Sequence, residues 1–163
     1  MGCDIHVYRE AKINGKYESL DTWVDGDGLG YLDIPYEHDN FQGRDYGLFT
    51  LLATVRGCSE YSLDPKGIPE DCCDEVRAVI DGWGVDGHSH SYLTLTELKK
   101  LYVRAYNDYD YESQLCNGLD SLYDLVKLFD GHIGPEGSIL PSGQGEGGSP
   151  NGEDARIVFF FDN

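Results

Sequence analysis

Basic residues are scarce in this chain of 163 residues, which has 12 Lys and Arg against 30 Asp and Glu and a formal net charge of −18 at pH 7. Proteins bind duplex nucleic acid and anionic membranes mainly through Lys and Arg, because these side chains neutralise phosphate. The charge therefore argues against both as partners. A small anionic ligand is still compatible with the sequence, since a local pocket can oppose the overall field.

The sequence also lacks a cysteine framework and a long apolar run. Its five cysteines are odd in number, none is spaced C-x-x-C, and the adjacent Cys72 and Cys73 are poorly placed for a mutual disulfide. Reduced thiols are therefore expected. No stretch has the length and hydrophobicity of a secretion signal or a transmembrane helix. These absences predict a soluble cytoplasmic protein.

Common catalytic motifs are missing as well. The chain has no P-loop, no G-x-G-x-x-G after a strand, no G-x-S-x-G and no H-E-x-x-H. Two acidic runs, 25–28 and 108–112, resemble the start of a calcium loop, but neither has the later glycine and glutamate of an EF-hand in frame. Any catalytic site must therefore be built from residues that are distant in sequence.

Hydrophobic periodicity predicts an α+β fold. Residues 3–10 alternate as in a half-buried strand, and residues 156–161 are apolar throughout, as in a buried strand. We expect a mixed or antiparallel sheet that contains both termini. Helical spacing with N-cap residues and glycine stops predicts four helices, over 46–56, 70–81, 94–106 and 119–129.

Length and composition predict one domain over residues 1–163. Residues 25–41 read as a long loop rich in glycine, and residues 131–153 as a mobile loop rich in Gly, Pro and Ser. Strands and helices do not alternate regularly, which favours α+β over a parallel α/β fold.

Two histidine motifs lie far apart in the sequence, Asp4-Ile5-His6 and His88-Ser89-His90. Residues i and i+2 of a strand point to the same face. Asp4 and His6 would therefore share one face, and His88 and His90 would pair likewise.

If the fold brings the two motifs together, one aspartate and three imidazoles would form a site for zinc, manganese or iron(II). Asp162, at the end of the apolar C-terminal strand, would be a further ligand or would orient a histidine. The alternative is that the histidines make polar contacts in a surface strand and a glycine-rich turn.

Two more residues are candidates for catalysis. Arg44 lies just before the helix expected at 46–56 and would bind a phosphate, or instead pair with a carboxylate while Asp45 caps the helix. Asp86, two residues before His88, would orient a histidine or act as a general base.

Four sequence blocks together resemble a family of small phage and prophage proteins. The blocks are MGCDIHVY at residues 1–8, RDYGLF at 44–49, DGHSHSYLT at 86–94 and RIVFFFDN at 156–163. The resemblance spans nearly the whole chain. It implies a phage product that acts in the bacterial cytoplasm and is dispensable for the virion, and it specifies no activity.

The sequence leaves three functions open. The first is a metal-dependent phosphodiesterase or nucleotidase acting on a small nucleotide, with Asp4, His6, His88, His90 and Asp162 at the metal. The second is a non-catalytic protein that sequesters a small nucleotide or binds a host protein. The third is an acidic decoy for a basic host surface, which the charge permits but the histidine motifs do not explain.

Overall fold

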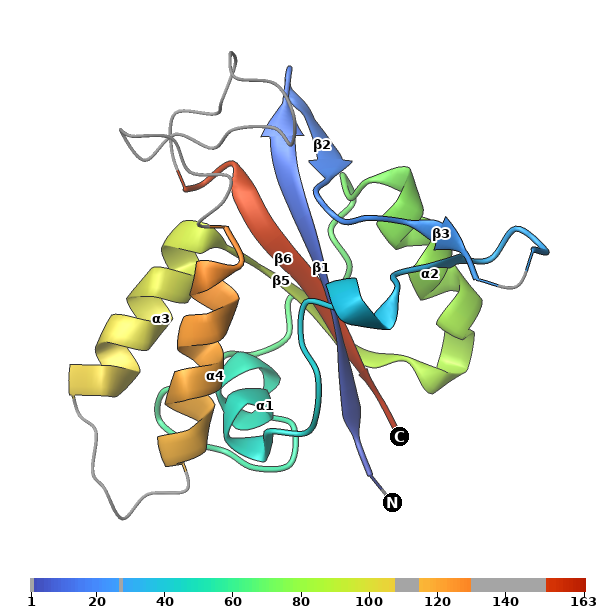
Figure 1. Cartoon of the computed structure of the whole chain (residues 1–163). Coiled ribbons are helices and arrows are strands. Elements are labelled where there is room, and N and C mark those ends of the chain that lie inside the picture. The colour runs from blue at the N-terminus through green and yellow to red at the C-terminus, as the bar shows by residue number, and fades with distance from the viewer. Residues whose placement is uncertain (1, 27, 108–114, 130–151) are drawn as a thin grey trace.

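A four-stranded antiparallel sheet lies at the centre of the protein (Figure 1). The computed structural model describes residues 2–26, 28–107, 115–129 and 152–163. The strands of the sheet, in spatial order, are β2 (Lys16–Ser19), β1 (Asp4–Ile13), β6 (Ala155–Asp162) and β5 (His88–Thr94). The helices are α1 (Tyr46–Ala53), α2 (Asp74–Trp83), α3 (Leu95–Asn107) and α4 (Leu115–Lys127). A separate two-stranded hairpin consists of β3 (Val24–Asp25) and β4 (Leu32–Asp33).

The two ends of the chain pair with each other in the middle of the sheet. Strand β1 is antiparallel to β6, from Asp4 opposite Asp162 to Ala11 opposite Ala155. Both chain ends therefore emerge at the same edge of the fold (Figure 1). This confirms the α+β fold with both termini in one antiparallel sheet.

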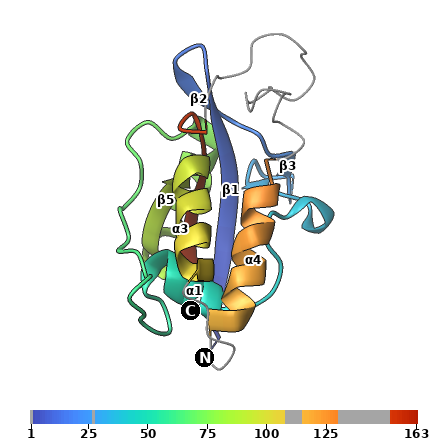
Figure 2. The same cartoon turned by 90° about the vertical axis from the view of Figure 1, so that its left-hand side faces the viewer.

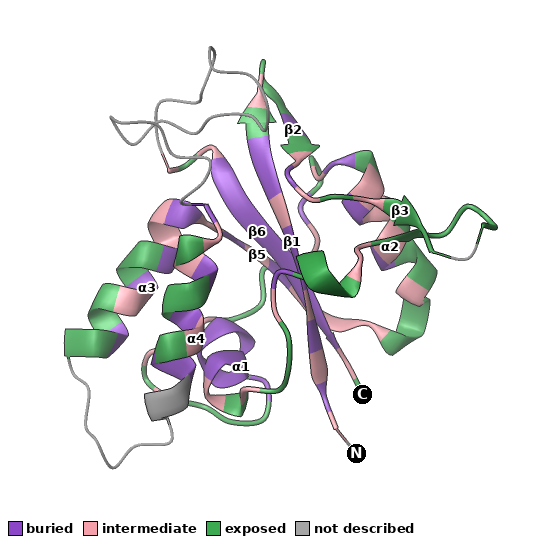
Figure 3. Cartoon of the chain, viewed as in Figure 1, coloured by how far each residue is buried: buried purple, intermediate pink, exposed green. Residues whose placement is uncertain are grey.

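The alternation in β1 gives the sheet two different faces. Ile5 and Val7 point into the larger hydrophobic core, whereas Tyr8 points into a smaller one on the other side. Strand β6 is buried from Ala155 to Phe161 because it has a strand on each side and covered faces (Figure 3). The uninterrupted apolar run that indicated a buried strand is explained by this central position.

Three helices, α1, α3 and α4, cover one side of the sheet, here called the helical face (Figure 2). Their buried side chains, including Leu52, Leu98 and Leu122, pack against residues such as Phe159 of β6. Helices α1 and α4 approach closely at a glycine, since a Cβ on Gly118 would lie 2.5 Å from a backbone carbon of α1. This layer is the main core of the protein.

Local capping explains where two of these helices begin. The Asp45 carboxylate accepts hydrogen bonds from the backbone N–H groups of Gly47 and Leu48, at 2.9 and 3.1 Å. At α3, the Thr94 hydroxyl accepts from the Glu97 N–H while the Glu97 carboxylate accepts from the Thr94 N–H, at 3.1 and 2.9 Å. Both signals were readable in the sequence as an N-cap and a capping box.

Helix α2 alone covers the other side, here called the α2 face (Figure 1). It buries only Val76 and Ile80 in its own span. Its N-terminus is held to the sheet by charge, because the buried Glu10 carboxylate accepts from the Cys73 N–H at 2.6 Å and from Arg156 Nε at 2.7 Å. The α2 face therefore has a small apolar core and a polar anchor.

Some sequence predictions need correction or cannot be compared. The four helices exist; the first begins where predicted, and the other helix ends differ from the prediction by one to four residues. The loop expected at 25–41 also contains part of the β3–β4 hairpin and a single 3-10 turn, Tyr36–His38. The loop expected at 131–153 lies outside the described residues except for its last two positions.

Candidate functional site

The residues predicted to bind a metal lie on three adjacent strands. Asp4 and His6 are on β1, Asp162 is on β6, and His88 and His90 are on β5. Because β6 lies between β1 and β5, the two histidine motifs flank the same central strand. The fold thus brings the motifs to one sheet but keeps them one strand apart.

His6 lies in an aromatic environment beside a carboxylate. Its ring centroid is 4.5 Å from that of Trp83 and 4.8 Å from that of Phe160. Its Nε2 is 3.2 Å from Asp162 Oδ2, and the backbone N–H of Asp4 donates to the other oxygen of the same carboxylate. His6 is therefore positioned by two rings and by Asp162, as a histidine oriented by a carboxylate is in many sites.

The Asp4 carboxylate forms an ion pair with Arg44. The guanidinium donates from Nε and from Nη2 to the two oxygens of the Asp4 carboxylate, at 2.5 and 2.9 Å. These hydrogen bonds to Arg44 lower the pKa of Asp4 below its usual value. Of the two sequence alternatives for Arg44, the structure contains pairing with a carboxylate, with Asp45 capping α1.

His88 and His90 do not share a face, so that expectation is wrong. His88 is opposite Phe161 and Ser91 is opposite Phe159, which leaves one extra residue in β5. The bulge is at Ser89, whose φ is +51°. His88 stacks on Phe161 of the larger core, and His90 stacks on Phe160 of the α2 face.

The two imidazoles have no hydrogen-bond partner at Nε2 within the described residues, although both atoms are buried. Burial lowers the pKa of His90, and the nearby His88 lowers it further. Across residues 2–26, 28–107, 115–129 and 152–163, no group of three or more His, Cys, Asp or Glu side chains is arranged to hold a metal ion. Asp4, His6 and Asp162 come together at one sheet end, whereas His88 lies on the opposite face.

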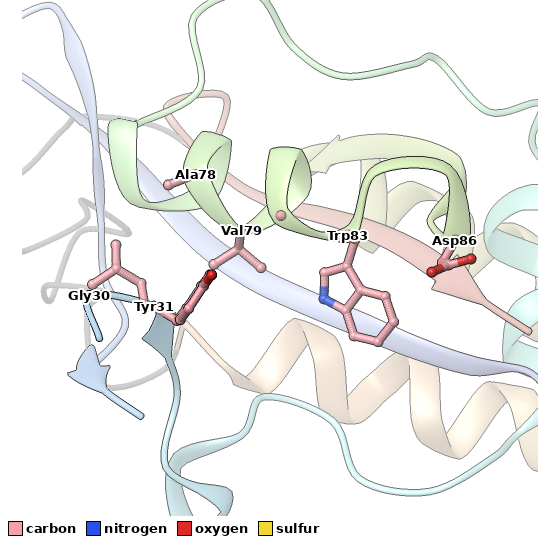
Figure 4. Close-up of a pocket in the computed structure, with 8 residues that line it drawn as sticks. Gly30, Tyr31, Ala78, Val79, Trp83 and Asp86 are labelled. Carbon is pink, nitrogen blue, oxygen red and sulfur yellow. The ribbon is translucent and has the colours of Figure 1, made fainter. Parts of the chain in front are cut away.

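Next to His6, two adjoining cavities of about 440 and 360 Å³ form what we call the aromatic groove. The groove lies between the β3–β4 hairpin and helix α2, and Tyr31, Leu32, Val79 and Trp83 line both cavities. Tyr31 projects from the hairpin side and Trp83 from the end of α2, with Val79 between them (Figure 4). The volumes are in the range of small-ligand sites.

Within the described part of the chain, the only charged or titratable groups lining the groove, apart from its tyrosines, are His6, Asp33 and Asp86. No Lys or Arg among these residues lines it. Asp86 lies beyond Trp83 (Figure 4) and makes no hydrogen bond to a histidine within the described residues. The groove is therefore aromatic, with two carboxyl groups and one imidazole in its lining.

Sequence reasoning missed most of the groove. The sequence could have indicated Tyr8, because it follows Asp4 and His6 on the same face of β1. Trp83 comes just before Gly84 in the sequence, in the segment that leads to His88, but no sequence pattern indicated that it contacts His6. Tyr31 lies in a glycine-rich segment without periodicity and carried no signal at all.

Comparison with known proteins finds no matching family model, no matching curated protein and no matching solved structure. The resemblance to phage proteins therefore stays a prediction. Among the described residues, no helix is both long enough and apolar enough to cross a membrane. The evidence for a function therefore comes from the residues around His6 and the aromatic groove.

Proposed function

We propose that this protein binds a small planar ligand without negative charge, of nucleobase or nucleoside size, in the aromatic groove and sequesters it without turnover. The observation that carries the proposal is a ligand-sized groove with Tyr31 and Trp83 in its walls, where the described lining residues include two carboxylates, His6 and no lysine or arginine. Aromatic side chains stack on any planar ring, with about 1–3 kcal/mol per nucleobase. Carboxylates accept the N–H groups of such rings and repel phosphate.

The sequence predicted a small nucleotide as the ligand, and this proposal keeps only the base or nucleoside and leaves out the phosphate. Arg44, the predicted phosphate ligand, is already paired with Asp4 and does not line the groove. The lining residues of the described chain include no serine, threonine, cysteine or lysine that would act as a nucleophile. Binding without turnover is therefore the simplest use of this site.

The test is to titrate the protein with adenosine, guanosine and cytidine and with their 5′-monophosphates. Binding is measured by calorimetry and by tryptophan fluorescence. A nucleoside should bind more tightly than its monophosphate. Trp83→Ala should weaken binding by about 5- to 150-fold, the equivalent of one stacking contact. The chain has only two tryptophans, so Trp23 reports on folding in this variant.

A matched pair of exposed tyrosines supplies the control. Tyr31→Ala removes a groove residue that is 65 % exposed, and Tyr36→Ala removes a tyrosine that is 74 % exposed and does not line the groove. Neither change should lower stability, and only the first should weaken binding. The proposal would be overturned if the wild type, Tyr31→Ala and Tyr36→Ala bound the nucleoside with equal affinity. Tighter binding of the monophosphates, or no binding of any nucleoside, would overturn it as well.

A second candidate is the metal-dependent phosphohydrolase, narrowed to Asp4, His6 and Asp162. The observation that favours it is their proximity: Asp4 and Asp162 are cross-strand partners, and His6 contacts the Asp162 carboxylate. Two carboxylates and one imidazole suit zinc, manganese or iron(II), and such a metal would supply a Lewis acid. Asp4 would first have to leave Arg44, which would free the guanidinium for a phosphate.

Calorimetric titration with Zn²⁺ and Mn²⁺ separates the two candidates. The metal site requires that His6→Ala and Asp162→Asn abolish binding and that His88→Ala, on the other face, retains it. Arg44→Met should strengthen binding by releasing Asp4. The absence of metal binding, together with no hydrolysis of bis(p-nitrophenyl) phosphate, would remove this candidate and leave the nucleoside proposal untouched.

A further inference from the structure

A second groove runs along helix α3, on the helical side of the sheet, and we call it the α3 groove. It consists of two adjoining cavities of about 250 and 390 Å³ that share Lys100 and Arg104. Leucines from three segments, Leu63, Leu93 and Leu101, line the first cavity. Leu93 and Leu101 are buried and Leu63 is half-buried, so they form an apolar floor between α3 and the segment before α2.

The rim of the α3 groove is basic in a strongly acidic protein. Four of the chain's 12 Lys and Arg residues line it, namely Lys66, Lys99, Lys100 and Arg104. The carboxylates of the lining are those of Asp64 and Glu97. The local charge is thus opposite in sign to the net charge of −18.

Most of these cations are not neutralised by ion pairs. Lys66 pairs with Glu97 at 2.6 Å. Within the described ranges, no carboxylate lies within 4.0 Å of Lys99, Lys100 or Arg104, and Arg104 donates instead to the backbone carbonyl of Glu60. The side chains of Lys99 and Lys100 are both exposed. Within the described residues, Lys99 and Lys100 are therefore available to an anion, and Arg104, which also lies over the Tyr61 ring at 5.4 Å, adds positive charge beside them.

We infer that the α3 groove binds a small amphipathic anion, with its apolar body on the leucines and its anionic head group on Lys100 and Arg104. Charge complementarity gives the sign of the ligand, because cations gathered on a protein of charge −18 attract anions locally. The leucines give its apolar part. The cavity volumes favour a small molecule over a macromolecule. This inference is independent of the aromatic groove.

The probes are 8-anilinonaphthalene-1-sulfonate and its uncharged analogue N-phenyl-1-naphthylamine, whose fluorescence rises in apolar sites. The sulfonate should bind more tightly, and added salt should weaken it selectively, because screening acts on the charged head group. Decanoate and decyl phosphate should displace it. Their relative potency shows whether the site prefers a carboxylate or a phosphate head group.

Charge-reversal variants test the position. Lys100→Glu should weaken sulfonate binding by about tenfold and leave the uncharged probe unchanged. Lys16→Glu, an exposed reversal on the β1–β2 hairpin, is the matched control and should bind nearly as the wild type.

Four results would overturn the inference. The first two are equal binding of the two probes and an effect of Lys16→Glu on sulfonate binding as large as that of Lys100→Glu. The third is a loss of sulfonate binding in Trp83→Ala, which would place the probe in the aromatic groove. The fourth is that the sulfonate does not bind at all.

Discussion

The two faces of the sheet bury their residues by different means. On the helical face, three helices form a continuous apolar layer in which Phe159 and Phe161 are fully buried. On the α2 face, one helix covers Val158 and Phe160, and the other contacts combine aliphatic side chains, rings with polar atoms and a buried ion pair between Glu10 and Arg156. The same central strand thus supplies a dry core on one side and a polar, hollowed surface on the other.

We expect stability and ligand binding to depend on different parts of the molecule. Between the sheet and the three helices there is little room for a ligand, because protein interiors pack at high density. The α3 groove lies at the margin of this layer, between α3 and the segment before α2, whereas on the α2 face the single helix leaves space beside it, which the aromatic groove occupies. We expect substitutions in the buried layer of the helical face to change stability and substitutions of exposed residues in the two grooves to change binding.

The largest effect is expected on the helical face. Phe159→Ala removes a fully buried ring and should lower the free energy of unfolding by about 3–5 kcal/mol. Trp83→Ala, at the partly exposed edge of the α2 face, should lower the free energy of unfolding by much less while it weakens binding of the proposed ligand. Urea denaturation followed by circular dichroism measures both. Equal losses of stability would contradict the division between the two faces.

The buried ion pair on the α2 face should have the next largest effect. Glu10→Ala leaves the buried Arg156 guanidinium with Asp71 as its only carboxylate partner among the described residues and removes the acceptor of the Cys73 N–H. Stability should fall by about 3 kcal/mol, the usual cost of removing one partner of a buried pair.

Replacing both charges separates lost packing from an uncompensated charge. Glu10→Leu/Arg156→Met should recover most of the stability lost in Glu10→Ala, since buried pairs are often replaceable by apolar side chains of similar size. A double variant as unstable as the single one would show that the α2 face depends on these charges themselves, for example through the stacking of Arg156 on Tyr17.

The smallest effect concerns His90 and pH. Its pKa is lowered by burial, so the unfolded chain takes up a proton that the folded protein resists as the pH falls below the usual histidine pKa of about 6.5. The wild type should therefore lose stability relative to His90→Gln between pH 7 and pH 5. Denaturation curves of both proteins at several pH values give the free energy of unfolding as a function of pH. If this dependence were the same for both proteins, His90 would not contribute to the loss of stability at low pH.

A large part of the fold was predictable because its signals are local. The alternation in β1, the apolar run of β6 and the capping box at Thr94 each depend on neighbouring residues, and all three are present in the structure. The candidate site was predictable only in part. Asp4, His6 and Asp162 come together because β1 and β6 pair in a register that their hydrophobic patterns favour.

The remaining features depend on contacts that no local pattern encodes. One extra residue at Ser89 sends His88 and His90 to opposite faces, and a serine with positive φ carries no sequence signal comparable to a glycine. The pairing of Arg44 with Asp4 joins residues 40 positions apart. Many carboxylates in so acidic a chain would have been equally plausible partners.

Local patterns were sufficient to predict the class of fold, the pairing of the two chain ends in one sheet and the face that carries Asp4 and His6. The reason is that strand alternation and helix capping are properties of adjacent residues. Tertiary contacts were needed to show that Tyr31 and Trp83 meet beside His6, and that Lys66 joins the cations of α3 in one groove. These groupings join segments that are distant in the chain, and packing alone brings such segments together.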